Sequence, residues 1–139
     1  MASTRAHHVG VTVADLEGAV EFYRDVLGLD VLDRFTVSGE AFASAVGVEG
    51  ATGEFVHLDA DGARIELIEY EPEGEERTVP SVNQPGATHV GLAVSDLDGF
   101  HKSLPDGVGT LSEPRTTDTG SRILFVRDPE DNLVELIEA

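Results

Sequence analysis

In the segments HVGVTV (8–13) and HVGLAV (89–94), apolar residues occupy every second position. Successive side chains of a strand point to opposite faces, so this period of two predicts a strand in each segment with one apolar face. The other face carries His8 in the first strand and His89 in the second. The two predicted strands are therefore near copies of each other.

A helix is predicted directly after each of these strands. Asp15 is a typical N-cap, apolar residues follow at helical spacing (16, 19, 20, 23, 26 and 27), and Gly28 is placed to end the helix. The second copy starts after Asp96 and is shorter, because Pro105 stops it. The segment SGEAFASAVG (38–47) is a further candidate helix in the first half.

The similarity between the halves extends beyond these strands and amounts to an internal repeat. AHHVGVTVADLEG (6–18) aligns without gaps on ATHVGLAVSDLDG (87–99), with eight of thirteen positions identical. ARIELIEY (63–70) and NLVELIEA (132–139) share the sequence Glu-Leu-Ile-Glu. A repeat of this kind indicates two structural modules of the same design.

Further strands complete each module. They are predicted at 30–37, 54–59 and 63–70 in the first half and at 108–112, 121–127 and 132–138 in the second. Each half is then a βαβββ module of the α+β class, and the modules span 1–70 and 87–139 of one structural domain. The segment EPEGEERTVPSVNQPG (71–86) between them concentrates Pro, Gly and charge, which is typical of an exposed linker.

Four residues at duplicated positions are candidate metal ligands. Glu66 and Glu135 lie on the last strand of each module, opposite the bulky aliphatic face, as His8 and His89 do on the first strand. If the first and last strands are neighbours, each module presents one imidazole beside one carboxylate. Two modules related by a pseudo-twofold axis would then hold one divalent ion between two His and two Glu, with positions left for water and substrate.

Taken singly, each of these residues would be interpreted as an ordinary strand residue, so the duplication is what favours a metal site. Cysteine is absent, which excludes thiolate ligands.

The charge of the chain restricts the classes of partner that it is expected to bind. Asp and Glu total 27 against 9 Lys and Arg, giving a formal charge of −18, which repels nucleic acid and anionic membranes. No secretory start and no apolar run of membrane-spanning length are present, so a cytoplasmic protein is expected. Lys102 is the only Lys. A surface rich in carboxylates and poor in Lys indicates a salt-rich cytoplasm, with an ordinary acidic protein as the alternative.

The segments HVGVTVADLEGAVEFYRDVLGL (8–29), ARIELIEY, HVGLAVSDLD (89–98) and FVRDPEDNLVELIE resemble the vicinal oxygen chelate superfamily. This superfamily includes glyoxalase I, methylmalonyl-CoA epimerase, extradiol dioxygenases and bleomycin-resistance proteins. The resemblance spans nearly the whole chain. It implies two βαβββ modules forming a cupped mixed sheet with helices on the convex side, and metal ligands on the first and last strands of each module.

Those ligand places hold His8, Glu66, His89 and Glu135, an order similar to that of glyoxalase I. Asp131 stands where the family's turn before the last strand usually has Gly; Asp tolerates the left-handed conformation, so the turn is expected to persist.

The resemblance implies a metal-dependent lyase or isomerase. One divalent ion (Ni, Co, Zn, Mn or Fe) would stabilise an enediolate or enolate of a small oxygenated substrate, and Glu66 and Glu135 are candidates both to bind the ion and to move the proton. An extradiol-type dioxygenase with redox-active Fe or Mn, and a resistance-type protein that binds without turnover, remain alternatives. No thiol-peptide cofactor site is recognisable. A homodimer is expected, because related proteins complete their sites within one chain or across a swapped dimer.

Four other residues are weaker candidates. His57 and Arg122 lie on inner strands and are suited to orient a substrate, although surface roles are favoured for both. His7 is expected on the helix side of its strand and His101 on the second predicted helix, each structural or exposed.

Overall fold

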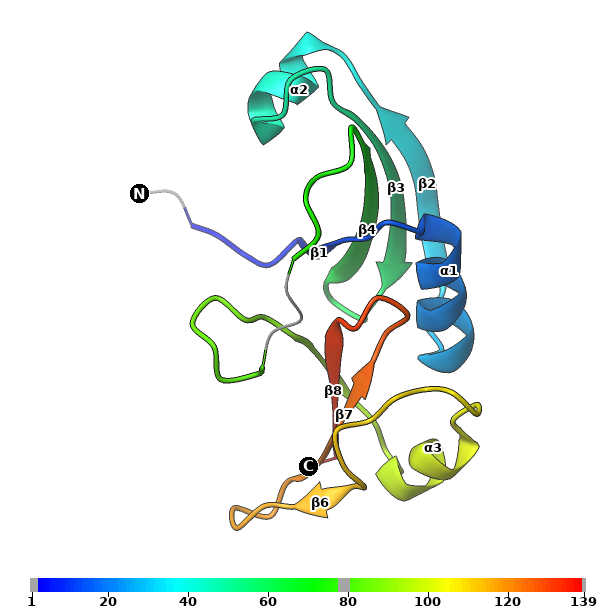
Figure 1. Cartoon of the computed structure of the whole chain (residues 1–139). Helices are drawn as coiled ribbons and strands as arrows, with labels where there is room; N and C mark the ends of the chain where they lie inside the picture. The colour runs from blue at the N-terminus through cyan, green and yellow to red at the C-terminus, as the bar shows by residue number, and fades with distance from the viewer. Residues whose placement is uncertain (1–2, 78–80, 139) are drawn as a thin grey trace. The chain divides into compact units, whose positions relative to one another are not determined.

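A computed structural model describes residues 3–77 and 81–138, so residues 78–80 of the predicted linker lie outside the described residues (Figure 1). The chain divides into two compact units, Met1–Glu76 and Arg77–Ala139. Each unit is described by itself.

The first unit contains one four-stranded mixed sheet. Its strands lie in the order β1-β4-β3-β2, in which β1 runs parallel to β4 and the other neighbours are antiparallel. The elements are β1 (His8–Thr12), α1 (Leu16–Glu21), the π-helical segment η1 (Phe22–Val26), β2 (Val31–Val37), α2 (Glu40–Val46), β3 (Thr52–Asp59) and β4 (Arg64–Glu71).

The second unit repeats this topology with strand order β5-β8-β7-β6, and its first strand again runs parallel to its last. Its elements are β5 (Val90–Ala93), α3 (Leu97–Ser103), β6 (Arg115–Thr116), β7 (Arg122–Arg127) and β8 (Leu133–Glu138). The predicted α+β class with two tandem βαβββ modules is confirmed. The predicted helix within 38–47 is also present, as α2.

The strand predicted at 108–112 is wrong. In that region the chain makes one isolated bridge, from Thr110 to Val126, and the paired strand is β6, a few residues later. Gly107 adopts a φ of 93°, a left-handed conformation that a strand does not contain. Regular pairing resumes only after Pro114, whose nitrogen has no hydrogen to donate to a ladder.

The first helix of each unit is capped in the same way. Asp15 accepts a hydrogen bond from the Gly18 N–H at 3.1 Å, and Asp96 accepts one from the Gly99 N–H at 3.0 Å. A Cβ added at Gly99 would lie 2.3 Å from the Asp96 carboxylate, which explains why this position of the repeat is Gly. The duplicated Asp and Gly are therefore structural residues.

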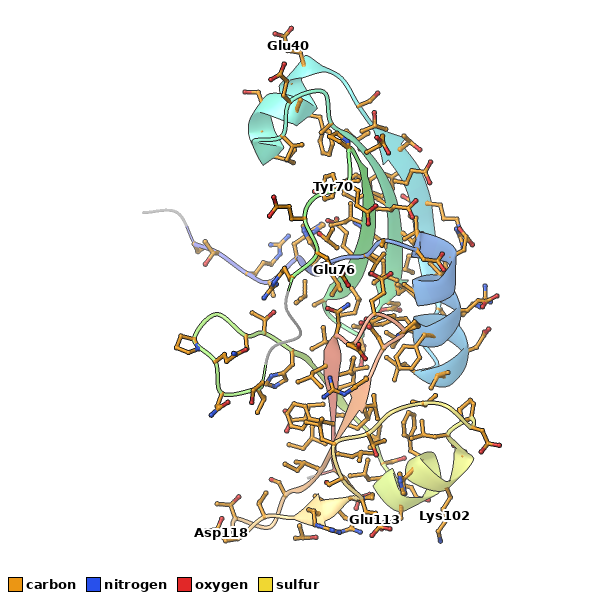
Figure 2. The ribbon with its side chains drawn as sticks, in the orientation of Figure 1. Glu40, Tyr70, Glu76, Lys102, Glu113 and Asp118 are labelled. Carbon is orange, nitrogen blue, oxygen red and sulfur yellow. The ribbon has the colours of Figure 1, made fainter. Side chains whose placement is uncertain are left out.

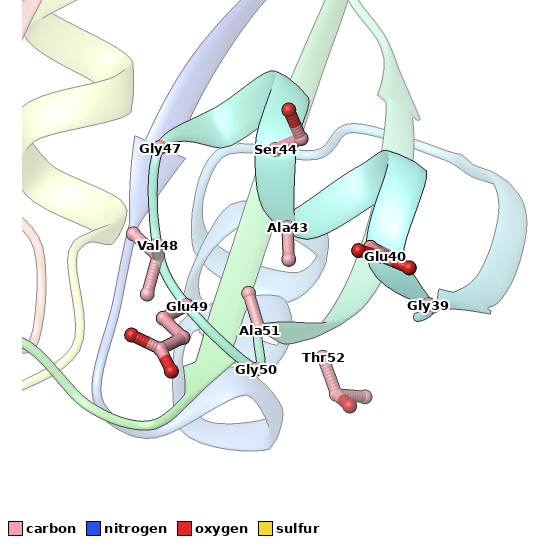
Figure 3. Close-up of a pocket in the computed structure, with 10 residues that line it drawn as sticks. All are labelled: Gly39, Glu40, Ala43, Ser44, Gly47, Val48, Glu49, Gly50, Ala51 and Thr52. Carbon is pink, nitrogen blue, oxygen red and sulfur yellow. The ribbon is translucent and has the colours of Figure 1, made fainter.

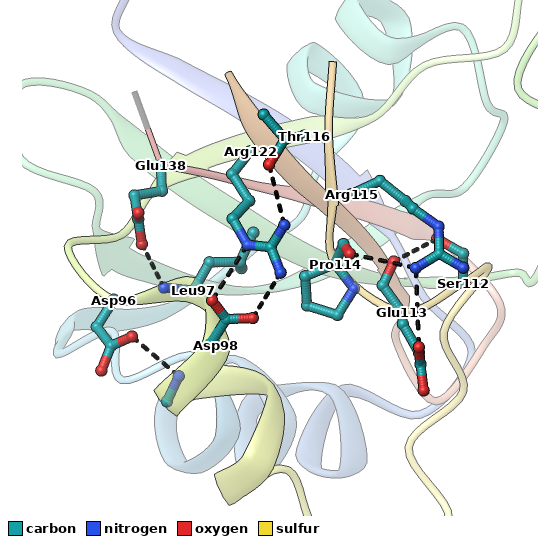
Figure 4. Close-up of polar contacts among 11 residues, drawn as sticks. Asp96, Leu97, Asp98, Ser112, Glu113, Pro114, Arg115, Thr116, Arg122 and Glu138 are labelled. Atoms are coloured by element: carbon teal, nitrogen blue, oxygen red, sulfur yellow. Dashed lines mark hydrogen bonds and ion pairs between the residues drawn. The ribbon is translucent and has the colours of Figure 1, made fainter. Parts of the chain in front are cut away.

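The last Glu of each Glu-Leu-Ile-Glu sequence also serves the helix. The Leu16 N–H donates to Glu69 at 3.3 Å, and the Leu97 N–H donates to Glu138 at 2.7 Å (Figure 4). These carboxylates accept hydrogen bonds from N–H groups at the helix N-terminus, and their negative charge interacts favourably with the positive end of the helix dipole. The duplicated Glu69 and Glu138 therefore have a structural role at the helix N-termini. Glu66 and Glu135, the other duplicated pair, do not have a role of that kind.

The aliphatic faces of the strands form the core. Ile65 and Leu67 of β4 are buried, as are Val134 and Leu136 of β8, in agreement with the predicted alternation. Helix α1 contacts β4 and buries Val20, while the neighbouring π-helical segment buries Tyr23. The opposite faces of β4 and β8 therefore carry Glu66 and Glu135.

The turn between β7 and β8 keeps the expected form. Asp131 has a φ of 65°, so Asp occupies the left-handed position at which the family usually has Gly. Buried Asp128 holds the turn by accepting hydrogen bonds from the Glu130 and Asn132 N–H groups. The turn fixes where β8 begins and hence the place of Glu135.

Charged side chains cover the outside of both units. The labelled Glu40 and Lys102 project away from their ribbons (Figure 2). Among residues 3–77 and 81–138, no helix is both long and apolar enough to cross a membrane.

Candidate metal centre

The first His–Glu pair lies across the parallel strands β1 and β4. The register places Gly10 beside Glu66 and His8 beside Arg64, so the His8 ring reaches along the strand toward the carboxylate. His8 Nε2 lies 3.5 Å from Glu66 Oε1. The His8 side chain is 40% exposed and the Glu66 side chain 12%, which leaves an accessible imidazole beside a largely buried carboxylate.

The second pair has the same arrangement. Gly91 lies beside Glu135 across the parallel strands β5 and β8, and His89 directly precedes β5 rather than lying within it. His89 Nε2 lies 3.3 Å from Glu135 Oε1, with side-chain exposures of 36% and 22%. The structure thus brings together both predicted pairs, each within its own unit.

The spacing of each pair fits two ligands of one ion. Metal–nitrogen and metal–oxygen bonds of ~2.1 Å, at angles between a right angle and the tetrahedral angle, place two ligand atoms roughly 3.0–3.4 Å apart. The pairs measure 3.5 and 3.3 Å. Imidazole nitrogen and carboxylate oxygen also form a donor set that suits Ni, Co, Zn, Mn or Fe.

Each pair supplies only half of a four-ligand set. Within the described parts of the chain, no group of three or more His, Asp or Glu side chains is arranged to hold an ion by itself.

Glycines leave space at both pairs. A Cβ at Gly10 would lie 3.8 Å from Glu66 Oε1, and one at Gly91 would lie 4.0 Å from Glu135 Oε1. Each of these oxygens is the one that faces the His of its pair. Neither glycine has a positive φ, so the backbone does not require Gly there. A side chain larger than a methyl group at either glycine would occupy the space beside Oε1.

His57 lies beside Glu66 and not at the surface. A surface role was favoured, but His57 is buried on β3, directly opposite Glu66 in the antiparallel register. Its Nε2 lies 2.6 Å from Glu66 Oε2. This separation is that of a hydrogen bond and is shorter than two ligands of one ion normally adopt. His57 is therefore a partner of the carboxylate rather than a third ligand.

The far side of the His57 ring contacts Arg64. Arg64 Nη1 lies 3.2 Å from His57 Nδ1. A guanidinium only donates hydrogen bonds, so Nδ1 accepts and the ring proton resides on Nε2, where it points at Glu66. Arg64, His57 and Glu66 form a directed hydrogen-bonded chain.

His7 also belongs to this neighbourhood. Its Nδ1 lies 2.8 Å from His8 Nδ1, and its ring centroid lies 6.4 Å from that of His57. The ring is therefore on the Glu66 side of the sheet and not on the helix side, although it is exposed as expected. His7 precedes the first strand, where alternation no longer fixes the side-chain direction.

The second unit has no imidazole in the place of His57. Phe125 of β7 lies directly opposite Glu135, as His57 does opposite Glu66. Its ring packs edge-on against His89 with centroids 5.0 Å apart. A phenyl ring offers no hydrogen to a carboxylate, so the two modules surround their glutamates differently.

An aromatic cluster continues from His57 along its sheet face. Phe35 contacts His57 at 5.1 Å between centroids and stacks on Phe55 at 5.0 Å. Phe42 of α2 packs against Phe55 and stacks on Tyr70. The cluster anchors α2 to the sheet and gives the first His–Glu pair an apolar surround on one side.

Arg122 has a structural partner. It donates two hydrogen bonds to Asp98 of α3, at 3.1 and 2.7 Å, and one to Thr116 at 3.0 Å (Figure 4). The hydrogen bond from Arg122 lowers the pKa of the Asp98 carboxyl. Arg122 thus ties β7 to α3, and the favoured non-catalytic role fits these contacts. His101 lies on α3 as expected.

A hollow of about 640 Å³ lies between α2 and the start of β3. Its lining consists mainly of small residues, with Glu40 and Glu49 as its carboxylates (Figure 3). None of the four candidate ligands lines it. It is therefore separate from the His–Glu pairs.

Comparison with known proteins identifies relatives over nearly the whole chain. The family model described as the Glyoxalase/Bleomycin resistance protein/Dioxygenase superfamily matches residues 5–136. A 2-epi-5-epi-valiolone epimerase from Actinomyces sp is 30% identical over 94% of this chain and 77% of its own length.

Solved structures have the same fold. A glyoxalase family protein from Bacillus cereus superposes with a TM-score of 0.87 at 25% identity, covering 99% of this chain and 95% of that one. Lactoylglutathione lyase from Agrobacterium tumefaciens superposes with a TM-score of 0.66 at 19% identity, covering 99% and 95%.

Proposed function

The chain belongs to the Glyoxalase/Bleomycin resistance protein/Dioxygenase superfamily, and on that premise we propose that it is a metal-dependent isomerase or lyase. It moves a proton at a carbon next to a carbonyl of a small oxygenated substrate. The observation that carries this proposal is the duplicated His–Glu pair, spaced at 3.5 Å in one unit and 3.3 Å in the other. Between the two activities, an epimerase is favoured.

In this proposal His8, Glu66, His89 and Glu135 hold one divalent ion, either within one chain or across a homodimer. Nickel, cobalt, zinc, manganese and iron all suit two imidazoles and two carboxylates. When bound, the ion lowers the energy of negative charge that develops on a substrate oxygen. The open space beside Gly10 and Gly91 supports access of a substrate to the same oxygens.

The two carboxylates provide the acid–base chemistry. A carboxylate oxygen of Glu66 or Glu135 takes the proton from the carbon, and the electron pair of the C–H bond moves toward the carbonyl oxygen. In an isomerase the proton returns to carbon. When the new C–H bond forms on the opposite face, as epimerisation requires, the proton comes from a second acid on that face, which is protonated beforehand.

The relative with 30% identity favours epimerisation, because it is a 2-epi-5-epi-valiolone epimerase. Glyoxalase-type chemistry uses the same proton transfer. An extradiol-type dioxygenase would need Fe or Mn that changes oxidation state, and a resistance-type protein would bind without turnover. These two alternatives are distinguished by the experiment below.

The experiment measures solvent deuterium exchange. The protein is loaded with Co²⁺ or Ni²⁺ and incubated in D₂O with 2-epi-5-epi-valiolone, with related hydroxyketones and with the hemithioacetal of glutathione and methylglyoxal, and proton NMR follows the carbon-bound hydrogen. We expect metal-dependent loss of that signal for at least one substrate, abolished in the double variant Glu66→Gln/Glu135→Gln. Absence of exchange across the set, or oxygen consumption with a catechol, would contradict the proposal.

A further inference from the structure

We propose that His57, oriented by Arg64, is a positioning residue that locks the Glu66 carboxylate as a metal ligand, whereas Glu135 has no such lock. This inference rests on the proposed function, since it concerns the same ion. Glu66 and Glu135 occupy equivalent positions of the repeat, but in this inference Glu66 is a fixed ligand and Glu135 a freer one.

The two oxygens of Glu66 have separate contacts. Oε2 accepts the hydrogen bond from His57 Nε2 at 2.6 Å, and Oε1 faces His8 Nε2 at 3.5 Å. With Oε2 occupied, the carboxylate presents Oε1 as its one outward ligand atom. The His57 and Glu66 side chains are only 7% and 12% exposed, so little water competes for this hydrogen bond.

Arg64 fixes which way the His57 ring donates. Because Arg64 Nη1 donates to Nδ1 at 3.2 Å, the proton of the ring lies on Nε2 and is directed at Glu66. In the opposite tautomer, the N–H at Nδ1 would face the N–H of Arg64, so that two donors would meet. The unprotonated Nε2 would face the Glu66 carboxylate, so that two acceptors would meet. Arg64 thus makes the hydrogen bond to the carboxylate obligatory.

The second module lacks the hydrogen-bonded chain that Arg64, His57 and Glu66 form in the first. Phe125 occupies the position of His57, and it packs against the His89 ring instead of binding the carboxylate. Glu135 is also the more exposed carboxylate, at 22% against 12% for Glu66. Its side chain therefore keeps more freedom to leave and regain a ligand position, which suits it to carry the proton in the proposed reaction.

A held ligand binds metal more tightly than a free one, because the side chain is already ordered before the ion arrives. Removing an outer hydrogen-bond partner of a metal ligand typically costs about 10–100-fold in metal affinity. The same loss is expected when His57 is replaced by a residue that cannot donate. A purely structural His57 would affect the stability of the metal-free protein without this change in affinity.

The test titrates Co²⁺ into the metal-free 139-residue chain by calorimetry and records the cobalt absorption spectrum. His57→Phe reproduces the second module, and His57→Gln restores an N–H donor. Arg64→Met removes only the group that orients the ring. We expect about 10–100-fold weaker binding for His57→Phe, with an altered spectrum, and recovery of most of the affinity in His57→Gln. Arg122→Met removes an Arg whose hydrogen bonds go to Asp98 and Thr116; it serves as the matched control and should bind as wild type does.

An unchanged dissociation constant and spectrum in His57→Phe would overturn the inference while leaving the proposed function intact. Failure of the wild-type chain to bind Co²⁺ would instead overturn the proposed function. If His57→Phe does not fold, Arg64→Met decides the matter: weaker binding than in the control supports the positioning role, and wild-type affinity overturns it.

Discussion

Glu66 and Glu135 occupy the same position of the repeat, but their contacts predict different responses to substitution. In Glu66→Gln the amide oxygen must accept from His57, so the NH₂ group points toward His8 and cannot bind a cation. In Glu135→Gln the amide is free to rotate and offer its oxygen. We expect Glu66→Gln to lose about tenfold more Co²⁺ affinity than Glu135→Gln, measured by calorimetry. Equal losses would contradict this difference.

A second prediction at the residue scale concerns Gly91, the glycine beside the Glu135 carboxylate. A Cβ at Gly91 would lie at ordinary contact distance, 4.0 Å from Glu135 Oε1, so Gly91→Ala should retain Co²⁺ affinity. Gly91→Val adds two methyl groups in the space beside that oxygen. We expect at least about a tenfold loss of affinity for the Val variant. A Val variant that binds as well as the Ala variant would show that this space is not used.

The two His–Glu pairs were predictable because the repeat and the strand alternation both point to them, whereas their role as metal ligands stays a prediction. His57 was missed because its role depends on the register of β3 against β4. The predicted strands at 54–59 and 63–70 indicate a hairpin, but residue 57 lies opposite residue 66 only because the turn closes at Ala60 and Ala63, one residue beyond the predicted end of the first strand. Arg64 orients the ring only through a hydrogen bond to His57 Nδ1, a contact that no sequence pattern encodes.

At the scale of elements, the helix caps and the terminal turn followed from local chemistry. Asp15 and Asp96 cap α1 and α3 as their sequence positions indicate. The strand that was wrongly predicted at 108–112 lies between Gly107 and Pro114, two residues that interrupt regular strand structure. Its short apolar run therefore did not suffice for pairing. The π-helical turns of Phe22–Val26 were also beyond prediction, because the apolar spacing of this stretch fits an ordinary α-helix.

The turn before β8 offers a stability prediction. Asp131 is a non-glycine residue at a φ of 65°, a conformation that Gly adopts without steric cost. We expect Asp131→Gly to raise the free energy of unfolding by about 0.5–1 kcal/mol in denaturant titrations, and Asp131→Val to lower it by at least as much. Both variants should bind Co²⁺ as wild type does if the turn only places β8. A destabilised Gly variant would show that the Asp131 side chain itself supports the turn.

For the whole molecule, charge is the dominant property. The formal charge of −18 places many like charges on the surfaces of both units, and added salt screens their repulsion. We expect the melting temperature of the metal-free chain to rise between low and molar KCl. Comparison with an equal concentration of sucrose separates charge screening from general exclusion effects. A melting temperature that stays constant or falls in KCl would contradict adaptation to a salt-rich cytoplasm.

In the proposed metal centre, two half-sites, one in each module, share one ion. Calorimetric titration of Co²⁺ into the metal-free chain tests this most directly, because the stoichiometry is the same for a site within one chain and for two sites across a homodimer. We expect one Co²⁺ per chain, with both His8→Ala and His89→Ala greatly weakening that single binding event. Two ions per chain, or no specific binding, would contradict it.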